Sequence, residues 1–433
     1  MLRKKVSEDG IGVKYINSAC VITSTPDITI LHDPWFTDGI YDGSWFSFPQ
    51  VTDPIETIGD TDCIFISHIH PDHYDINFLR DYFKRFGSKE VLIAEHTPNH
   101  LGKKMLADGI EPTIVRGLIN FGNTEVQIVP HVTESITDID SAIIIKYKSE
   151  NKIHCVINTN DIQSDLQFSR KLKNLAINVD ILLCGYSGAS SYPQTYFDLS
   201  DPTLIIEAEN KKKFHLNKYL NHVNEINAKV NIPFAGKYVL GGKLCDLNAL
   251  RGIPDAVEVL ELDPKAIVLS DCGGEINTLD LKASKIRLAP YEKDAVHRRL
   301  EEIRNATMSY ERLFAIGEVT QLPIKQLLIS ATINAKKNSE IHEDHYFCFN
   351  LNEREWALIN ANKESSTSIS FVSSRLELPV PRSEIDIDSR YLFGLLTKIY
   401  HWNNAEIGSQ FNTRTFPDKN NRVEKKFLYY LTV

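Results

Sequence analysis

The first half of the chain alternates short apolar runs, rich in β-branched residues, with turn-forming residues, a pattern that predicts β-strands. These strands lie within residues 12–25, 27–35, 62–68, 90–95, 124–130, 141–148, 152–161 and 179–188. Helical spacing occurs at residues 76–86, which end before Gly87, and at residues 211–230. Strands separated by helices, with several strands antiparallel, indicate a layered α/β fold.

The pattern changes after residue 280. A charged helical segment, two segments of alternating polarity and another helix follow at residues 290–314, 345–360, 366–374 and 389–402. We therefore expect one domain over residues 1–280 and a smaller α+β domain over residues 281–433. The second domain is expected to cap a pocket or to mediate association.

Composition and charge narrow the class of protein. The 433 residues are 42% hydrophobic and 24% charged, which is typical of a soluble globular protein with two or three domains. The formal net charge of -9 argues against a nucleic-acid partner, because phosphate binding usually needs a basic face. The seven cysteines form no C-x-x-C pair, so reduced thiols in the cytoplasm are expected. We find no signal peptide and no apolar run long enough to span a membrane.

The stretch "ISHIHPDHYD", Ile66 to Asp75, carries the candidate chemistry and directly follows a predicted buried strand. Alternate residues at a strand end point the same way, so His68 and His70 can face one metal ion. A turn then brings Asp72 and His73 towards a second position. Imidazoles and a carboxylate suit zinc or iron. The alternative interpretation is a histidine-rich surface loop.

A metal site of this kind needs further ligands from other strands. His131 and Asp161 each follow an apolar strand pattern. A single histidine at a strand end is more often structural, but beside the first motif both are predicted to join the site.

The motif H-x-H-x-D-H at residues 68–73, with the later His131 and Asp161, resembles the metallo-β-lactamase superfamily. The resemblance implies a four-layer αβ/βα sandwich, followed here by the smaller α+β domain. Within the superfamily, the segments LHDPWF, GYSGASSYP, IPFAGKY and HWNNAEIGSQFNTRTFPD are similar to the catalytic region of CMP-N-acetylneuraminate hydroxylase. They are more distantly similar to N-acylphosphatidylethanolamine phospholipase D and the ascorbate-lactone hydrolases.

The resemblance implies two divalent metal ions, which could be zinc, iron or manganese. Their ligands would be His68, His70, Asp72, His73, His131 and Asp161. The first ion would be held by His68, His70 and His131, and the second by Asp72, His73 and one more histidine. Asp161 would bridge the ions, and Asp72 and Asp161 are the catalytic candidates. A hydroxide between the ions would be the nucleophile of a hydrolase, whereas iron in the same pocket can activate dioxygen.

The chain departs from the family pattern in two ways. It has no Rieske-type cysteine and histidine spacing, so an oxygenase would need electrons from a separate protein. The last histidine, expected shortly after the "FAG" segment, is also absent. His215 and His222 are interpreted as solvated residues of a helix. The second metal position is therefore incomplete, or Lys237, Tyr238 or a substrate group fills it.

Other residues are candidates for the surroundings of the metal site. The predicted substrate pocket consists of Trp35, Tyr186, Tyr192 and Lys237. The aromatic segment 35–49 is either a lid and substrate platform or packing against the sheet edge. Asp33 either orients a ligand histidine or organises a turn. The Gly/Ser-rich segment 185–193 could cradle an anionic group with its backbone N–H groups.

These observations favour a metallo-hydrolase acting on a phosphodiester, lactone or amide of a small-molecule or sugar-type substrate. The first alternative is a di-iron oxygenase, which the similarity along most of the chain favours and the missing Rieske domain disfavours. The second alternative is a non-catalytic protein whose degenerate metal site only stabilises the fold.

Overall fold

The computed structural model describes residues 9–133, 139–162, 166–314, 322–352, 355–366, 368–417 and 426–433. The prediction that the chain has no signal peptide concerns residues 1–8, which lie outside these ranges. Residue 418, the last of the segment similar to the hydroxylase, also lies outside them. No helix in the described part of the chain is long and apolar enough to cross a membrane.

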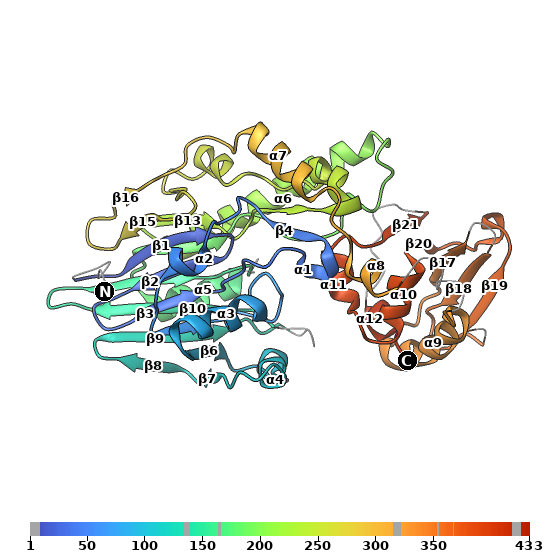
Figure 1. Cartoon of the computed structure of the whole chain (residues 1–433), viewed down its shortest axis with the longest axis horizontal. Helices are drawn as coiled ribbons and strands as arrows, with labels where there is room; N and C mark the ends of the chain where they lie inside the picture. Colours follow the sequence, from blue (N-terminus) through green and yellow to red (C-terminus); the bar gives the residue numbers. More distant parts are fainter. Residues whose placement is uncertain are drawn as a thin grey trace.

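Two sheets face each other in the first part of the molecule (Figure 1). The larger sheet has the order β16 (Ala283–Ser284), β15 (Gly274–Asn277), β1 (Gly12–Asn17), β2 (Cys20–Ser24), β3 (Thr29–His32), β5 (Cys63–Phe65), β6 (Glu90–Ala94) and β7 (Thr113–Val115). Its pairs are antiparallel from β16 to β3 and parallel from β3 to β7. The parallel strands β3 and β5 therefore end at the same edge, where the histidine motif begins.

The second sheet has the order β13 (Val230–Phe234), β12 (Ile181–Gly185), β11 (Ile153–Asn158), β10 (Ser141–Lys148), β9 (Thr124–Pro130) and β8 (Leu118–Phe121). Strands β11, β12 and β13 are parallel, and β8 to β11 pair antiparallel. Most of these strands match the predicted segments, because alternating or continuous apolar runs are a local signal.

Apolar side chains fill the space between the two sheets, and helices cover both outer faces. Val13 and Phe65 of the first sheet belong to one buried cluster with Ile143 and Leu183 of the second. Helices α3 (Ile76–Phe86) and α4 (His100–Ala107) pack on the outer face of the first sheet. Helices α5 (Leu166–Ala176) and α6 (Thr203–Ile226) cover the second. The predicted four-layer αβ/βα sandwich is confirmed.

Helix α3 begins at Ile76, directly after Asp75, the last residue of the stretch "ISHIHPDHYD". The carboxylate of Asp75 accepts a hydrogen bond from the backbone N–H of Phe78, which caps the helix. The same carboxylate accepts hydrogen bonds from the backbone N–H groups of Phe36 and Thr37. Asp75 therefore ties the aromatic segment to the start of the helix rather than serving as a metal ligand.

Helix α6 differs from its prediction in both length and burial. It begins at Thr203, eight residues before the expected start. His215 is 9% exposed and His222 is 5% exposed, so the interpretation of both as solvated residues is wrong. The helix lies on the second sheet, and Ser169 Oγ of α5 lies 2.7 Å from His222 Nδ1. A polar ring at an inward position is thus satisfied by a neighbouring helix, which the spacing of apolar residues does not reveal.

Six short elements lie outside the large sheets, and the aromatic segment 35–49 contains the first two of them. They are α1 (Ile40–Gly43), β4 (Trp45–Ser47), α2 (Pro54–Ile58), β14 (Tyr238–Leu240), η1 (Gly242–Leu250) and η2 (Ala256–Glu261). Strand β4 pairs with β14, so the aromatic segment lies directly beside Tyr238. The φ angle of Gly43 is +101°, and a Cβ there would lie 2.8 Å from Met308 Cα, so only glycine fits this approach of two chain segments.

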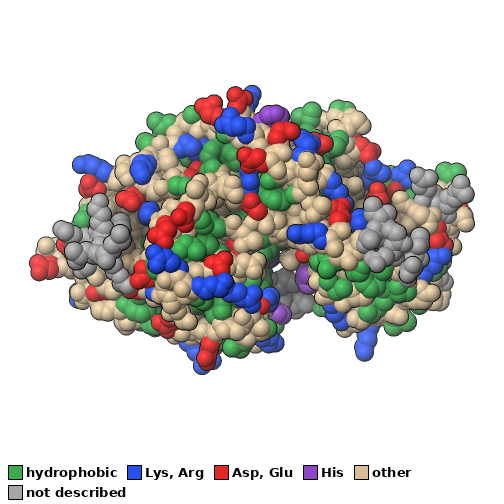
Figure 2. All heavy atoms as spheres, in the orientation of Figure 1, with side chains coloured by type: hydrophobic (Ala, Val, Ile, Leu, Met, Phe, Trp, Pro, Cys, Tyr) green, Lys and Arg blue, Asp and Glu red, His purple; other side chains and the backbone are tan. Residues whose placement is uncertain are grey.

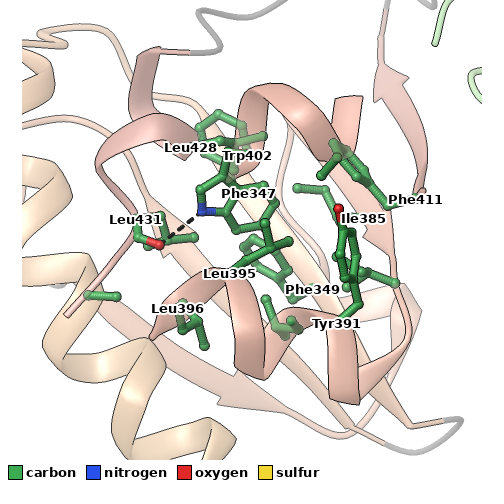
Figure 3. Packing of buried hydrophobic residues seen from close by; sticks show 14 of the residues in the cluster. Phe347, Phe349, Ile385, Tyr391, Leu395, Leu396, Trp402, Phe411, Leu428 and Leu431 are labelled. Carbon is green, nitrogen blue, oxygen red and sulfur yellow. Dashed lines mark hydrogen bonds between the residues drawn. The ribbon is translucent and has the colours of Figure 1, made fainter. Parts of the chain in front are cut away.

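The C-terminal part is a second α+β unit, as predicted. Its sheet has the order β19 (Ile369–Val372), β18 (Glu355–Asn360), β17 (Tyr346–Asn352), β20 (Arg382–Asp386) and β21 (Asn412–Phe416). Its other elements are α8 (Ser309–Leu313), α9 (Ile324–Ser339), η4 (Arg375–Glu377), α10 (Ser389–Leu396), α11 (Trp402–Ile407) and α12 (Lys426–Tyr430). Helix α7 (Lys293–Ile303) precedes them and packs against β4 and β14 of the first part. Figure 3 shows Phe347, Phe349 and Trp402 in its core, where Trp402 Nε1 donates to the carbonyl of Leu431 at 3.0 Å.

The two parts share one buried cluster. Trp35, Tyr41 and Trp45 of the aromatic segment belong to the same cluster as Phe347 and Tyr391 of the C-terminal unit. Figure 1 shows α1 beside α11 at this junction. Strand β16 still pairs with the first sheet after residue 280. The domain boundary near residue 280 stays a prediction.

Candidate metal centre

The H-x-H pair faces one point at the end of β5. Nε2 of His68 lies 3.0 Å from Nδ1 of His70. His131 follows β9, and its Nε2 atom is buried without a hydrogen-bond partner among the described residues. All three side chains line the same cavity. A buried imidazole nitrogen without a partner, beside two others, fits a metal ion better than an apolar pocket.

A second group of ligand atoms lies beside the first. Nε2 of His73 lies 3.2 Å from Oδ2 of Asp161 and 3.5 Å from Oδ2 of Asp72. The ligand atoms of His68, His73 and Asp161 lie within 4.8 Å of one another. His68 and His73 thus both lie close to Asp161, and the division of six ligands between two metal positions stays a prediction.

Asp33 holds the second group from behind. Its Oδ1 accepts the backbone N–H of Ser67 at 2.7 Å, and its Oδ2 lies 3.1 Å from Nδ1 of His73. The side chain of Asp33 is fully buried. A carboxylate that contacts Nδ1 of a histidine fixes the orientation of the ring and leaves Nε2 available to a metal ion. The geometry therefore favours the orienting role for Asp33, and His73 Nε2 points to Asp72 and Asp161.

Burial and neighbouring charges shift the titration of these groups. Burial, helped by the rings of His73 and His70, lowers the pKa of His68 well below its usual value. Burial also opposes protonation of His73, but Asp161, Asp72 and Asp33 together raise its pKa well above its usual value. Burial and the charge of Asp161 raise the pKa of Asp72. Carboxylates and imidazoles packed this closely are stabilised in their metal-binding forms by a cation, so the donor set fits divalent metal ions.

The site opens into a cavity of about 290 Å³. It is lined by Ser18, Tyr41, Trp45, His68, His70, Asp72, His131, Asp140, Asp161, Ser187, Gly188, Ala189, Ala235, Gly236, Lys237, Tyr238 and Ile407. Figure 2 shows a hollow between the two parts of the molecule, with histidine side chains at its edge. The cavity is large enough for a small molecule and places it directly against the histidine motif.

The predicted substrate pocket is only partly assembled here. Lys237 lines the cavity, as do Ser187, Gly188 and Ala189 of the Gly/Ser-rich segment. Trp35 is buried in the cluster shared with the C-terminal unit. Tyr186 packs behind Gly236 and leaves no room there for a side chain. Tyr192 hydrogen-bonds to Glu207, away from the lining residues.

Lys237 directly follows the "FAG" segment, shortly after which the last histidine was expected. Its ammonium lies 5.7 Å from the ring centre of Phe48 and 5.3 Å from that of Tyr291. Burial lowers the pKa of Lys237. Tyr238 stacks on Trp45 with ring centres 3.3 Å apart. Among the described residues, the histidines that line the cavity are His68, His70 and His131, which form the first group. The histidine of the second group is His73.

Asp140 and Tyr41 line the cavity but were not predicted individually from the sequence, although Tyr41 lies in the aromatic segment 35–49. Oδ1 of Asp140 lies 3.7 Å from Nδ1 of His68, and the Asp140 carbonyl accepts the N–H of His131. Its location in the cavity and the charge of Asp161 raise the pKa of Asp140. The hydroxyl of Tyr41 donates to Asp72 Oδ1 at 2.5 Å. An acidic residue directly before an apolar strand is a signal that could have indicated Asp140, whereas the aromatic segment does not by itself show that the hydroxyl of Tyr41 reaches Asp72.

Comparisons with known proteins show the family of the first part of the chain. The family model Lactamase_B_3, described as "Beta-lactamase superfamily domain", matches residues 12–234, just over half of the chain. A Mycolicibacterium smegmatis protein described as a Rieske 2Fe-2S iron-sulfur protein is 26% identical over 240 residues, covering 52% of this chain and 44% of that protein. Cytidine monophosphate-N-acetylneuraminic acid hydroxylase of Danio rerio is 23% identical over 240 residues, covering 53% and 38%. The chain thus matches less than half the length of these relatives.

Two solved structures are similar to parts of this chain at low sequence identity. CmlA, a diiron beta-hydroxylase from Streptomyces venezuelae, has a TM-score of 0.39 and 14% identity, covering 63% of this chain and 55% of that chain. Isothiocyanate hydrolase from Delia radicum gut bacteria has a TM-score of 0.40 and 12% identity, covering 61% and 98%.

Proposed function

Because this chain belongs to the family described as "Beta-lactamase superfamily domain", we propose that it is a metal-dependent hydrolase. The match confirms the resemblance to the metallo-β-lactamase superfamily. The observation that carries the proposal is the convergence of His68, His73 and Asp161, whose ligand atoms lie within 4.8 Å of one another at a cavity. Such a donor set suits catalysis by metal ions rather than by a protein nucleophile.

The proposed roles follow from the family pattern and from the distances between the donor atoms. His68, His70 and His131 hold one divalent ion, and Asp72 and His73 hold the other, with Asp161 between them. When bound, two such ions supply an activated water and polarise the bond under attack. Tyr41 donates to one oxygen of Asp72, which leaves the other oxygen directed to the side of His73. Zinc, iron and manganese are all compatible with imidazole and carboxylate ligands.

The far side of the cavity indicates the kind of substrate. Among the described lining residues, Lys237 alone is a lysine or an arginine. Ser187 and Gly188 line the same cavity. A half-buried cation on aromatic rings favours an anionic group on the ligand. We propose a small-molecule substrate, such as a sugar-type ester, lactone or amide, whose acidic group meets Lys237.

A di-iron hydroxylase is the second candidate function. It is supported by the names of the relatives, which include a sugar-nucleotide hydroxylase and a Rieske iron–sulfur protein. No cysteine of these 433 residues has Rieske spacing to a histidine, so the hydroxylase would draw electrons from a donor outside them. A non-catalytic role is the third candidate, because the second group contains fewer histidines than the family pattern.

The metal content of the purified protein tests the proposal. We expect two metal ions per chain, and His68→Ala or His70→Ala should lose most of them, whereas Asp161→Ala should keep part of the metal but lose activity on a panel of phosphodiesters, lactones and amides. The control is His345→Asn, a buried histidine that hydrogen-bonds Ser383 away from the cavity. Full metal content in both histidine variants would show that the assignment of the metal site is wrong.

The visible spectrum of the same sample separates the candidates. Colourless protein with zinc or manganese supports hydrolysis. Two irons with an oxo-bridge absorption support oxygen chemistry and a search for a reductant. Less than one metal ion per chain supports the non-catalytic role.

A further inference from the structure

One nitrogen of His70 is bonded by the C-terminal unit. Nε2 of His70 lies 3.0 Å from Oδ1 of Asn403, a residue 333 positions later in the chain. Asn403 lies in α11, which packs beside α1 at the junction of the two parts (Figure 1). The side chain of a remote element thus touches a residue of the histidine motif.

The partner atom determines which nitrogen of His70 carries the proton. A neutral imidazole has one N–H and one lone pair, and an amide oxygen can only accept a hydrogen bond. His70 must therefore carry its proton on Nε2 and its lone pair on Nδ1. That Nδ1 atom faces Nε2 of His68 at 3.0 Å, on the side of the cavity. The hydrogen bond to Asn403 presents the lone pair of His70 to the metal position.

The amide of Asn403 is itself held in one orientation. Its Nδ2 donates to the hydroxyl of Tyr429 in α12 at 3.3 Å. In this orientation the amide oxygen of Asn403 faces His70 and the amide nitrogen faces Tyr429. The neighbouring Trp402 is 2% exposed and anchors α11 to Leu431 (Figure 3). The C-terminal unit therefore fixes both the position and the orientation of the acceptor.

We propose that Asn403 is a positioning residue through which the C-terminal unit completes the metal centre. It sets the tautomer and the ring orientation of His70 and does not touch the metal or the substrate. The inference rests on the proposed function, because it assigns His70 as a ligand. It gives the C-terminal unit a role at the site besides covering the cavity.

Metal affinity tests the inference directly. Asn403→Leu keeps the approximate size of the side chain but removes the acceptor. We expect its dissociation constant for Zn²⁺, measured by competition with a chromogenic chelator, to rise about 10- to 100-fold for one of the two ions. Asn403→Asp keeps an acceptor oxygen towards His70 and is expected to hold the affinity within about threefold of the wild type.

Two further variants separate positioning from folding. Asn404→Leu changes the adjacent residue of the same helix and should leave the Zn²⁺ affinity unchanged. Tyr429→Phe removes only the hydroxyl that orients Asn403 and should weaken Zn²⁺ binding in the same direction by a smaller factor, even if Asn403→Leu fails to fold. The melting temperature of each variant without added metal reports any general loss of stability.

The outcomes distinguish this inference from the proposed function. Wild-type protein that binds no Zn²⁺ would overturn both. Wild-type binding together with unchanged affinity in folded Asn403→Leu, or in Tyr429→Phe where the leucine variant does not fold, would overturn the inference alone. Equal losses in Asn404→Leu and Asn403→Leu would also overturn it, because the effect would then be a general disturbance of α11.

Discussion

Lys237 provides a positive charge in a cavity whose metal end is rich in carboxylates. Burial lowers its pKa, as do Arg251 and Arg287, whereas Asp255 and Asp271 oppose the shift. Asp255 pairs with Arg287 at 2.7 Å, and Asp271 accepts a hydrogen bond from the hydroxyl of Tyr291. Both carboxylates are thus engaged elsewhere. Because Lys237 lines the cavity, we propose that its charge contributes to the selection of substrate charge.

Replacing Lys237 by methionine tests this role. Because a charge-assisted hydrogen bond contributes roughly 1.5–3 kcal/mol, we expect KM for an anionic substrate to rise about 10- to 100-fold. A neutral substrate with the same scissile bond should be affected much less. The control is Lys243→Met, which removes an ammonium 4.9 Å from the Tyr310 ring and away from the lining residues. Equal KM changes for both substrates would contradict the assignment.

The residues of the site were predictable to different degrees. His68, His70 and His73 lie within one short motif, and strand ends indicate His131 and Asp161, so local pattern was sufficient for these positions. Tyr41 and Asn403 approach the motif only through tertiary contacts. Tyr41 lies in the aromatic segment and Asn403 in the segment HWNNAEIGSQFNTRTFPD, but only the folded chain shows which side chains of these segments reach the motif.

Helix α6 shows the corresponding limit at the scale of an element. Its existence follows from apolar periodicity, but its first turns, before Lys211, carry exposed Ile205 and Ile206 and blur the pattern. His222 is buried against α5, where its Nδ1 atom meets Ser169. A polar residue that is satisfied by a neighbouring element looks like a surface residue in the sequence, so burial could be assigned only from the packed structure.

The burial of His222 predicts a pH-dependent stability. Burial lowers its pKa from 6.5 to about 4. The unfolded state therefore binds a proton that the folded state does not bind as the pH falls through 6.5 towards 4, and the free energy of unfolding decreases over that window. The full contribution, present above pH 6.5, is roughly 3 kcal/mol. His222→Gln should reduce this loss, as measured by urea unfolding at pH 7 and pH 5.

The acid sensitivity is not expected to vanish in that variant. Burial also lowers the pKa of His345 to about 4 and that of His32 to about 3, so both retain their own share. His297→Gln, at an exposed position of α7, is the control and should keep the wild-type dependence. An unchanged slope in His222→Gln would show that this histidine does not titrate as its burial implies.

At the scale of the whole molecule, the metal centre lies where the two α/β units meet. Tyr391 donates to Asp42 at 2.6 Å, and Gln410 donates to the carbonyl of Tyr41, whose hydroxyl reaches Asp72. Composition and pattern predicted both units and their order, because each has its own run of strands and helices. They did not predict the shared core, since contacts between units depend on side chains far apart in the sequence.

A shared core and a shared site predict that metal binding stabilises both units together. Zn²⁺ at 100 times its dissociation constant should add about 2.7 kcal/mol to the free energy of unfolding. Because Asn403 and Gln410 link the site to the C-terminal unit, the added protection should also reach β17, which is remote from the cavity. Hydrogen exchange of β17 amides, with calorimetry for a single transition, measures this coupling. Two transitions of which Zn²⁺ shifts only one would show that the units unfold independently, whereas one shifted transition that EDTA reverses would establish the C-terminal unit as part of the metal-binding structure.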